Sequence, residues 1–468
     1  MDFKKLESNV NALWERPVSH FFISDFSKLM TQPPSAQDLL FLISKKASER
    51  CLQNKNAVTP VQSLRHLIGV SELFDFMPTQ KNRWLPLVQA TWQAVCENRS
   101  EVLDIQKQLG SPPLTERLTL EVLKQELSQR KVSTLYPLIV FLLRTPKDRS
   151  KVLSLLIQAL LSDEAHLGGS VIDVIQVAKF CDRMQWKNYE YFWFPVLHSV
   201  FSDSQEIDAY PTAQVFYQNH WKTLLKALHP HGKVFLEADA LWVSLERDEK
   251  NTTLEKIKTW IEVGYSIHDL WEALKLCSAR LVLHSDFHHW ASSVAVLLYV
   301  EALASSGDRL EPEDQLKAFF MGVLFTKKMM ILSKPFVVLS AHPLTTQAQK
   351  QRPDVFLEYA IQRGKSEEAL GALEALIQQQ KVTLPFLELL AFAASKNDYR
   401  VMRGQEMRFG VAALKSYQES NHPLKADYLK AFVRLLALEP KDPTMYQALC
   451  NTQRIRLGSY AVGGDFNF

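Results

Sequence analysis

The chain has 468 residues, with 54 Lys and Arg against 51 Asp and Glu and a formal net charge of +3. This balance argues against nucleic acid as a partner, because nucleic-acid-binding proteins usually carry a concentrated basic face. The longest apolar runs, near 135–143 and 294–300, are far shorter than the roughly 20 residues that span a bilayer, so no membrane partner is expected. Five dispersed cysteines and an N-terminus without a signal-peptide core predict a cytoplasmic protein with free thiols.

Apolar residues recur at three- and four-residue spacing along nearly the whole chain, which predicts helices throughout. Helix starts are marked in chain order. Segments 35–38 and 266–269 have the capping-box pattern of Ser followed three residues later by Asp. Pro312 and Pro443 follow acidic residues and suit a first helical turn, where a missing N–H costs nothing.

Polar or proline-bearing segments separate the helical blocks. They are 31–36, 110–114, 145–150, 202–212, 247–252, 305–313, 340–353, 420–424 and 439–443. The blocks between them have the length of antiparallel helix pairs with short connections. The fold class predicted is all-α, a large array of antiparallel helix pairs. The break at 202–212 favours two lobes, 1–205 and 206–468, with a single domain as the alternative. Segments 58–96 and 284–325 share a pattern that suggests that the lobes are pseudo-repeats.

Three histidines and an aspartate precede the apolar segment that ends near 303. His284 and His288 are four residues apart, so one helix covering both would place them on the same face. Ser292, Ala295 and Tyr299 continue the face of His288, and the two small residues leave room in front of an imidazole.

A metal site is one interpretation of the histidines. His166 lies beside Asp163 and Glu164 ahead of an apolar helix, and neutral imidazole is a common metal ligand. Such a site would combine His166 and His288, with His231 or His284 as possible additions. The alternative is that these are helix-end and loop histidines that are solvated or hydrogen-bonded. The chain has no His-Glu-x-x-His motif and no Cys/His ligand array.

Two further patterns have simple structural interpretations. The aromatic run 189–195 has helical spacing and predicts a core segment. The pair Lys327–Lys328 predicts a solvated helix end.

Three segments carry a family resemblance. Segment 259–303 has a Gly-containing turn, a helix and then a helix with His288 and Ala295; 163–182 has a histidine before an apolar helix; 353–403 has a helix pair before Asp398. In these features the chain resembles the questin oxidase-like helical family, including the helical regions attached to bacterial Rieske-type proteins. The resemblance implies a helical fold and, in active members, oxygenation of polycyclic aromatic substrates at a histidine-rich, non-haem metal centre.

The chain departs from the pattern of that family at several positions. Gln62 stands where the family's first histidine would fall if Gly69 is aligned with the small residue, and His66 is one turn away. Ala291 replaces the threonine that follows the later histidine. No Rieske cluster motif, Cys-x-His paired with Cys-x-x-His, occurs.

The chain differs most from the family pattern in its last element. Asp398 is kept, but Arg400 and Arg403 stand at the His and Lys positions. Arginine stays protonated and has no lone pair for a metal, so these positions argue against the metal chemistry of the family.

Three functions are therefore expected as alternatives. The first is a questin oxidase-like helical protein with a degenerate metal site, without a cofactor, that binds a protein partner or a small anionic or aromatic ligand. Its site would contain His166, His288, Arg400, Arg403 and Gln62. The second is a metal-dependent oxidoreductase, an oxygenase with a rearranged site of His166, His231, His284 and His288. The third is a helical-repeat interaction scaffold.

Overall fold

A computed structural model describes most of the chain. The described residues are 3–15, 21–30, 35–50, 62–97, 104–109, 119–161, 168–202, 209–228, 236–285, 289–333, 343–397 and 404–453. Their regular elements are α-helices and short 3-10 helices, and none of these residues forms a β-strand. The predicted all-α fold is confirmed.

The chain forms two compact units, neither of which is continuous in sequence. Unit 1 comprises Met1–Leu103, Leu339–Leu414 and Leu429–Phe468, and unit 2 comprises Asp104–Val338 and Lys415–Tyr428. The lobe boundary expected at 205/206 lies inside unit 2, between α11 (Tyr189–Ser202) and α12 (Ala209–Leu224). The relation of the two lobes by duplication stays a prediction.

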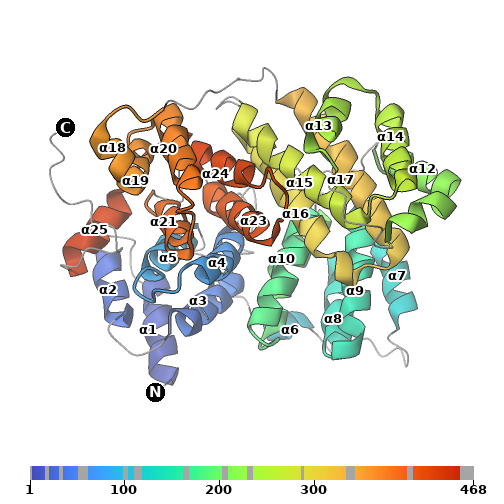
Figure 1. Cartoon of the computed structure of the whole chain (residues 1–468). Helices are drawn as coiled ribbons and strands as arrows, with labels where there is room; N and C mark the ends of the chain where they lie inside the picture. Colours follow the sequence, from blue (N-terminus) through green and yellow to red (C-terminus); the bar gives the residue numbers. More distant parts are fainter. Residues whose placement is uncertain are drawn as a thin grey trace. The chain divides into compact units, whose positions relative to one another are not determined.

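Unit 1 combines helices from the two ends of the chain (Figure 1). Its elements are α1 (Phe3–Glu15), α2 (Phe21–Met30), α3 (Ala36–Arg50), α4 (Gln62–Leu73), η1 (Phe74–Phe76), α5 (Trp84–Glu97), α18 (Gln347–Gln351), α19 (Pro353–Gln362), α20 (Ser366–Gln378), α21 (Leu384–Ala393), α25 (Thr444–Gln453) and the larger parts of α23 (Gln405–Glu419) and α24 (Ala426–Leu438). Helices adjacent in sequence pack together, as α4 does with α5 and α19 with α20. The C-terminal α25 also packs on α2 and α5, which joins the two ends of the chain in one core.

Unit 1 buries a carboxylate beside the end of α24. Glu439 is only 3% exposed and accepts a hydrogen bond from the side-chain amide of Asn397. The ammonium group of Lys441 lies 3.9 Å from its carboxylate. Burial raises the pKa of Glu439 above its ordinary range, and Lys441 and Asn397 only partly offset that effect. Desolvation therefore outweighs attraction at this site.

Unit 2 is assembled mainly from the middle of the chain. Its elements are α6 (Ile105–Leu109), α7 (Leu120–Gln129), α8 (Val132–Leu143), α9 (Pro146–Leu160), α10 (Gly169–Arg183), α11 (Tyr189–Ser202), α12 (Ala209–Leu224), η3 (Leu225–Leu228), α13 (Ala238–Arg247), α14 (Lys250–Val263), α15 (Ile267–His284), α16 (Trp290–Ser305), η5 (Gly307–Arg309) and α17 (Pro312–Leu332), with the end of α23 and the start of α24. Helix α16 packs against α10, α15 and α17, which makes it the central helix of this unit (Figure 1).

The predicted helix starts are largely confirmed. Ser35 and Asp38 exchange capping hydrogen bonds before α3, and Ser266 and Asp269 form a complete capping box before α15. Helix α17 begins at Pro312, and α25 begins directly after Pro443. These signals act within one turn of helix, so tertiary contacts do not override them.

The predicted stacking of His284 and His288 on one helix is wrong. Helix α15 ends at His284, because Ser285 adopts an extended conformation and its hydroxyl donates to the backbone oxygen of Leu281. The α-helix α16 begins at Trp290. His288 itself lies outside the described residues.

The prediction that Lys327 lies at a solvated helix end is also wrong. Lys327 is only 5% exposed, whereas Lys328 is exposed. The ammonium group of Lys327 donates to the backbone oxygens of Leu245 at 2.8 Å and Ser244 at 3.3 Å, near the end of α13. Both carbonyls belong to the last turn of α13, where a cation is favoured by the partial negative charge at the end of the helix. The aromatic run 189–195 is core as predicted, with Phe192, Trp193 and Phe194 buried.

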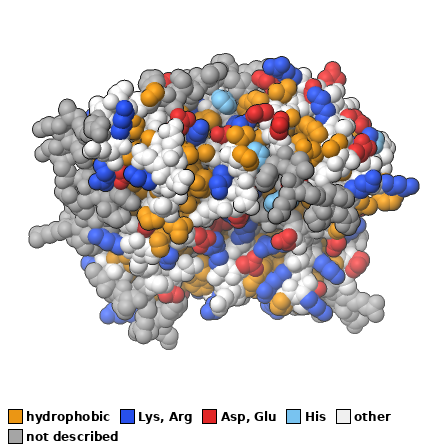
Figure 2. All heavy atoms as spheres, in the orientation of Figure 1, with side chains coloured by type: hydrophobic (Ala, Val, Ile, Leu, Met, Phe, Trp, Pro, Cys, Tyr) orange, Lys and Arg blue, Asp and Glu red, His pale blue; other side chains and the backbone are white. Residues whose placement is uncertain are grey.

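No described helix combines the length and hydrophobicity that a membrane span requires. On the surface, Lys and Arg side chains are interspersed with Asp and Glu over the face shown in Figure 2.

Candidate functional site

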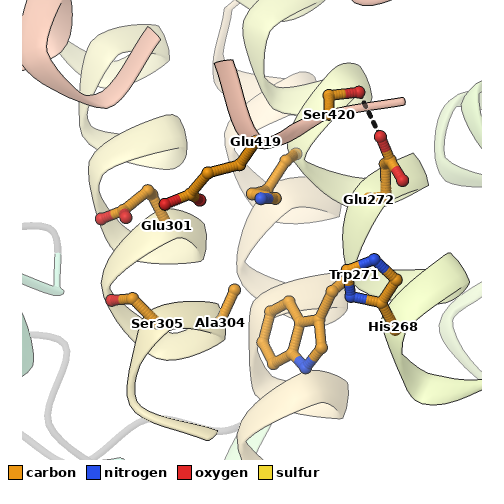
Figure 3. Close-up of a pocket in the computed structure, with 9 residues that line it drawn as sticks. His268, Trp271, Glu272, Glu301, Ala304, Ser305, Glu419 and Ser420 are labelled. Carbon is orange, nitrogen blue, oxygen red and sulfur yellow. Dashed lines mark hydrogen bonds between the residues drawn. The ribbon is translucent and has the colours of Figure 1, made fainter. Parts of the chain in front are cut away.

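A cavity lined by described residues lies in unit 2, between α15, α16 and the end of α23 (Figure 3). Its volume is about 170 Å³, close to that of an engineered cavity that holds benzene. It is lined by His268, Trp271, Glu272, Lys275, Glu301, Ala304, Ser305, Glu419 and Ser420. We call it the α15–α16 pocket.

Local sequence signals place the lining residues of α15 on one stripe. The Ser266–Asp269 capping box begins the helix, with the backbone N–H of Ser266 donating to Asp269 at 2.9 Å. From that start, positions 268, 271, 272 and 275 follow the spacing that brings side chains onto one helix face. Glu301, Ala304 and Ser305 repeat the same spacing on α16. In Figure 3, the α16 residues stand along one ribbon and His268 and Glu272 along another.

The carboxylate of Glu301 lies among several lysine side chains. Its side chain is 13% exposed, and its two oxygens lie 2.7 Å from the ammonium group of Lys415 and 3.6 Å from that of Lys179. Burial alone would raise the pKa of Glu301, but Lys179, Lys415 and Lys275 together lower it to about 2. Glu301 is therefore ionised at neutral pH.

Glu272 is held by neutral groups. It is 5% exposed, and its Oε1 accepts hydrogen bonds from the hydroxyl of Ser420 and, at 3.3 Å, from the backbone N–H of His422. The dashed line in Figure 3 marks the contact with Ser420. The second oxygen, Oε2, accepts no hydrogen bond from the described residues, and none of them forms an ion pair with Glu272 within 4.0 Å.

The chain after α23 is anchored, which fixes the Ser420 wall of the pocket. The backbone N–H of Leu424 donates to Nδ1 of His422 at 3.1 Å, so the imidazole proton is assigned to Nε2, which faces the backbone oxygen of Leu236 at 3.3 Å. Further along, Asp427 forms an ion pair with Arg280 of α15 at 2.7 Å. These contacts tie the segment after α23 to α15 and its neighbours.

Trp271 supplies the aromatic wall. Its ring meets Phe319 of α17 edge to face, with centroids 5.0 Å apart. A Cβ at Gly322 would lie only 3.3 Å from the indole, so the glycine allows α17 to approach the ring closely. The orientation of the indole is therefore set by packing behind it.

Of the residues predicted for the site, two are described and they belong to different units. His284 ends α15 in unit 2, where its ring contacts Trp242 of α13 at a centroid distance of 5.7 Å. Gln62 is the first residue of α4 in unit 1. His66, its neighbour one turn on, is fully buried against Gly404, where an added Cβ would lie 2.6 Å from the ring. His166, His231, His288, Arg400 and Arg403 lie outside the described residues.

The helices that follow the two main histidine positions, α10 and α16, do pack together. Gly168, just before α10, lies against the ring of Tyr299, where a Cβ would be 2.5 Å away. Tyr299 is nine residues into α16, about 13 Å along its axis at 1.5 Å per residue. The start of α10 thus packs beside the middle of α16, and the joint histidine site stays a prediction.

The described residues do not supply a metal centre. No group of three or more His, Cys, Asp or Glu side chains among them could hold a metal ion. In the α15–α16 pocket, both oxygens of Glu301 are already paired with lysines. This part of the chain offers a charged binding pocket and no ligand set for a non-haem metal.

Sequence reasoning missed the pocket because it gave weight to histidines. The signal was a stripe of polar residues at 268, 272 and 275 on a helix whose other faces are apolar. Its partners on α16 and at the end of α23 are about 30 and 150 residues away in sequence.

Comparisons with protein-family models, with curated proteins and with solved structures find no match to this chain. The resemblance to the questin oxidase-like family therefore stays a prediction.

Proposed function

We propose that this protein binds a small polar molecule in the α15–α16 pocket. One observation carries the proposal: two largely buried carboxylates, Glu272 and Glu301, and the ammonium group of Lys275 converge on a cavity of about 170 Å³. A few charged groups that line a concave pocket are typical of ligand sites, and burying charged side chains that bind nothing lowers the stability of the fold.

The pocket is preorganised for binding. Its lining residues stand on two packed helices and on a segment that Arg280 and His422 anchor. Sites on rigid elements lose less free energy on binding than sites on mobile loops, because fewer groups must be ordered. The proposal keeps the first alternative expected from the sequence, a binding protein, and gives it a site that needs no metal.

A ligand screen on the full chain tests the proposal. Small amino acids, primary amines, carboxylates and inorganic phosphate are tested by thermal shift, and hits are confirmed by calorimetry. A ligand of the pocket raises the melting temperature, because it binds the folded state alone.

Two variants locate the binding. Ala304→Phe places an aromatic ring in the pocket and should abolish binding, whereas Ala240→Phe, at an exposed position of α13, should leave it unchanged. If no probe binds, or if Ala304→Phe binds as wild type does, the proposal is wrong.

A further inference from the structure

The charges around the α15–α16 pocket are distributed unevenly. Glu301 is paired with Lys179 and Lys415, and Lys275 also acts on it, so three lysines face the carboxylates of Glu301 and Glu419. Lys275 forms no ion pair within 4.0 Å with any described residue, although it lines the cavity. This side of the pocket has one positive charge in excess.

The Glu272 side carries the opposite excess. The hydrogen bonds that Glu272 accepts come from neutral donors, Ser420 and the backbone of His422. The ammonium group of the nearby Lys425 donates to the backbone oxygen of Ser420 instead, at 3.3 Å. Glu272 thus has one carboxylate oxygen, Oε2, that accepts no hydrogen bond from the described residues.

The two uncompensated groups stand on one helix face. Glu272 and Lys275 are three residues apart on α15, which normally allows an ion pair across one turn of helix. They do not pair within 4.0 Å, and both line the pocket. Trp271, which directly precedes Glu272, adds an indole to the pocket, and the face of an indole ring attracts a cation.

We propose that the ligand of this pocket is a small zwitterion, a molecule whose ammonium group binds Glu272 and whose carboxylate binds Lys275. This inference rests on the proposed function. Each ligand charge would meet a protein charge of opposite sign that forms no ion pair within 4.0 Å with the described residues, and hydrogen bonds between charged groups are about twice as strong as those between neutral groups. A cavity that holds a benzene-sized molecule admits small amino acids.

Calorimetric titration of the full chain tests the ligand class. The probes are glycine, β-alanine and 4-aminobutyrate, which separate the two charges by increasing distances. n-Propylamine and propionate each carry one of the charges. At least one zwitterion should bind about tenfold or more tightly than both single-charge probes, since each charged hydrogen bond contributes about that factor.

Two variants assign the charges to their partners. Glu272→Gln keeps the acceptor for Ser420 and should make the best zwitterion bind no more tightly than propionate. Lys275→Met should reduce the same zwitterion to the affinity of n-propylamine. Glu262→Gln and Lys124→Met, at exposed positions of the same unit, should bind as wild type does. If Glu272→Gln does not fold, Lys275→Met still decides, because Lys275 acts on Glu301 only from beyond 4.0 Å and is the weakest of the three lysines around it.

The two proposals fail in different ways. If n-propylamine or propionate binds as tightly as every zwitterion and Ala304→Phe blocks it, the zwitterion is wrong and the pocket remains a binding site. If neither variant changes the binding of the best zwitterion, the assignment of its charges is wrong.

Discussion

Glu301 in unit 2 and Glu439 in unit 1 are both buried carboxylates, yet their pKa values shift in opposite directions. Lys179, Lys415 and Lys275 lower the pKa of Glu301 to about 2 against the cost of burial. Glu439 has Lys441 at 3.9 Å and the amide of Asn397, and burial still raises its pKa.

The difference between the two carboxylates follows from the charges around them. A buried carboxylate loses its hydration, and nearby positive charge must compensate for that loss. One lysine at 3.9 Å compensates less than several lysines do. The Glu301 cluster has cations to spare, and one of them, Lys275, lines a cavity. The Glu439 cluster has no such surplus. The contrast supports our proposal of a ligand site in unit 2.

The largest expected effect is the loss of the Glu301 carboxylate. Glu301→Gln should lower the free energy of unfolding by about 3 kcal/mol at pH 7, because three lysines are left facing a neutral amide. The pKa of Glu301 lies below the ordinary value of 4.5, and this sets how its contribution to stability changes with pH. The carboxylate stabilises the fold above pH 4.5, and the contribution is lost as the pH falls towards 2.

Urea denaturation of wild type and variant at pH 7 and pH 3.5 measures this effect. The difference in unfolding free energy should be smaller at the lower pH. A difference that is equal at both values would show that Glu301 is not held by its charge.

The contribution of Glu439 to stability should change with pH in the opposite direction. Because its pKa is raised, the protonated form stabilises the fold at low pH, and that contribution is lost as the pH rises above 4.5. Glu439→Gln keeps the acceptor for Asn397 and should increase the free energy of unfolding by on the order of 1 kcal/mol at pH 8.5, with little change at pH 5. The same denaturation series measures it, and a loss of stability at pH 8.5 would remove the contrast between the two carboxylates.

A smaller effect is expected when either lysine paired with Glu301 is replaced, and its size should differ between the two. Lys415→Met should raise the pKa of Glu301 more than Lys179→Met does, because Lys415 lies at 2.7 Å with a hydrogen bond and Lys179 at 3.6 Å. Each change should cost roughly 1 kcal/mol or less, as both lysines are partly exposed. Carboxyl carbon NMR titration of Glu301 measures the shift. Equal shifts in the two variants would show that distance does not set the interaction.

The sequence predicted the parts of the fold that local chemistry determines. The capping box at Ser266 and Asp269 and the helix start at Pro312 depend on neighbouring residues alone, and both are confirmed. Lys327 was placed wrongly because its environment depends on the end of α13, some 80 residues away. A lysine beside another lysine gives no local sign of burial.

The candidate site was harder to predict for the same reason. Glu272 and Lys275 are ordinary helix residues until α16 and the end of α23 enclose them. The histidines were predicted as possible metal ligands, and Arg400 and Arg403 were predicted from the family resemblance. His284 alone of the predicted metal ligands is described, and it ends its helix against Trp242 instead of continuing a face with His288.

Fluorine NMR of the full chain labelled with fluorotryptophan tests the central claim most directly, since Trp271 is one of ten tryptophans and lines the pocket. The signal of Trp271 is assigned as the one missing in Trp271→Phe. Adding the best zwitterion should shift the Trp271 signal more than any other tryptophan signal. A Trp271 signal that stays in place while the ligand binds and other tryptophan signals move would contradict it.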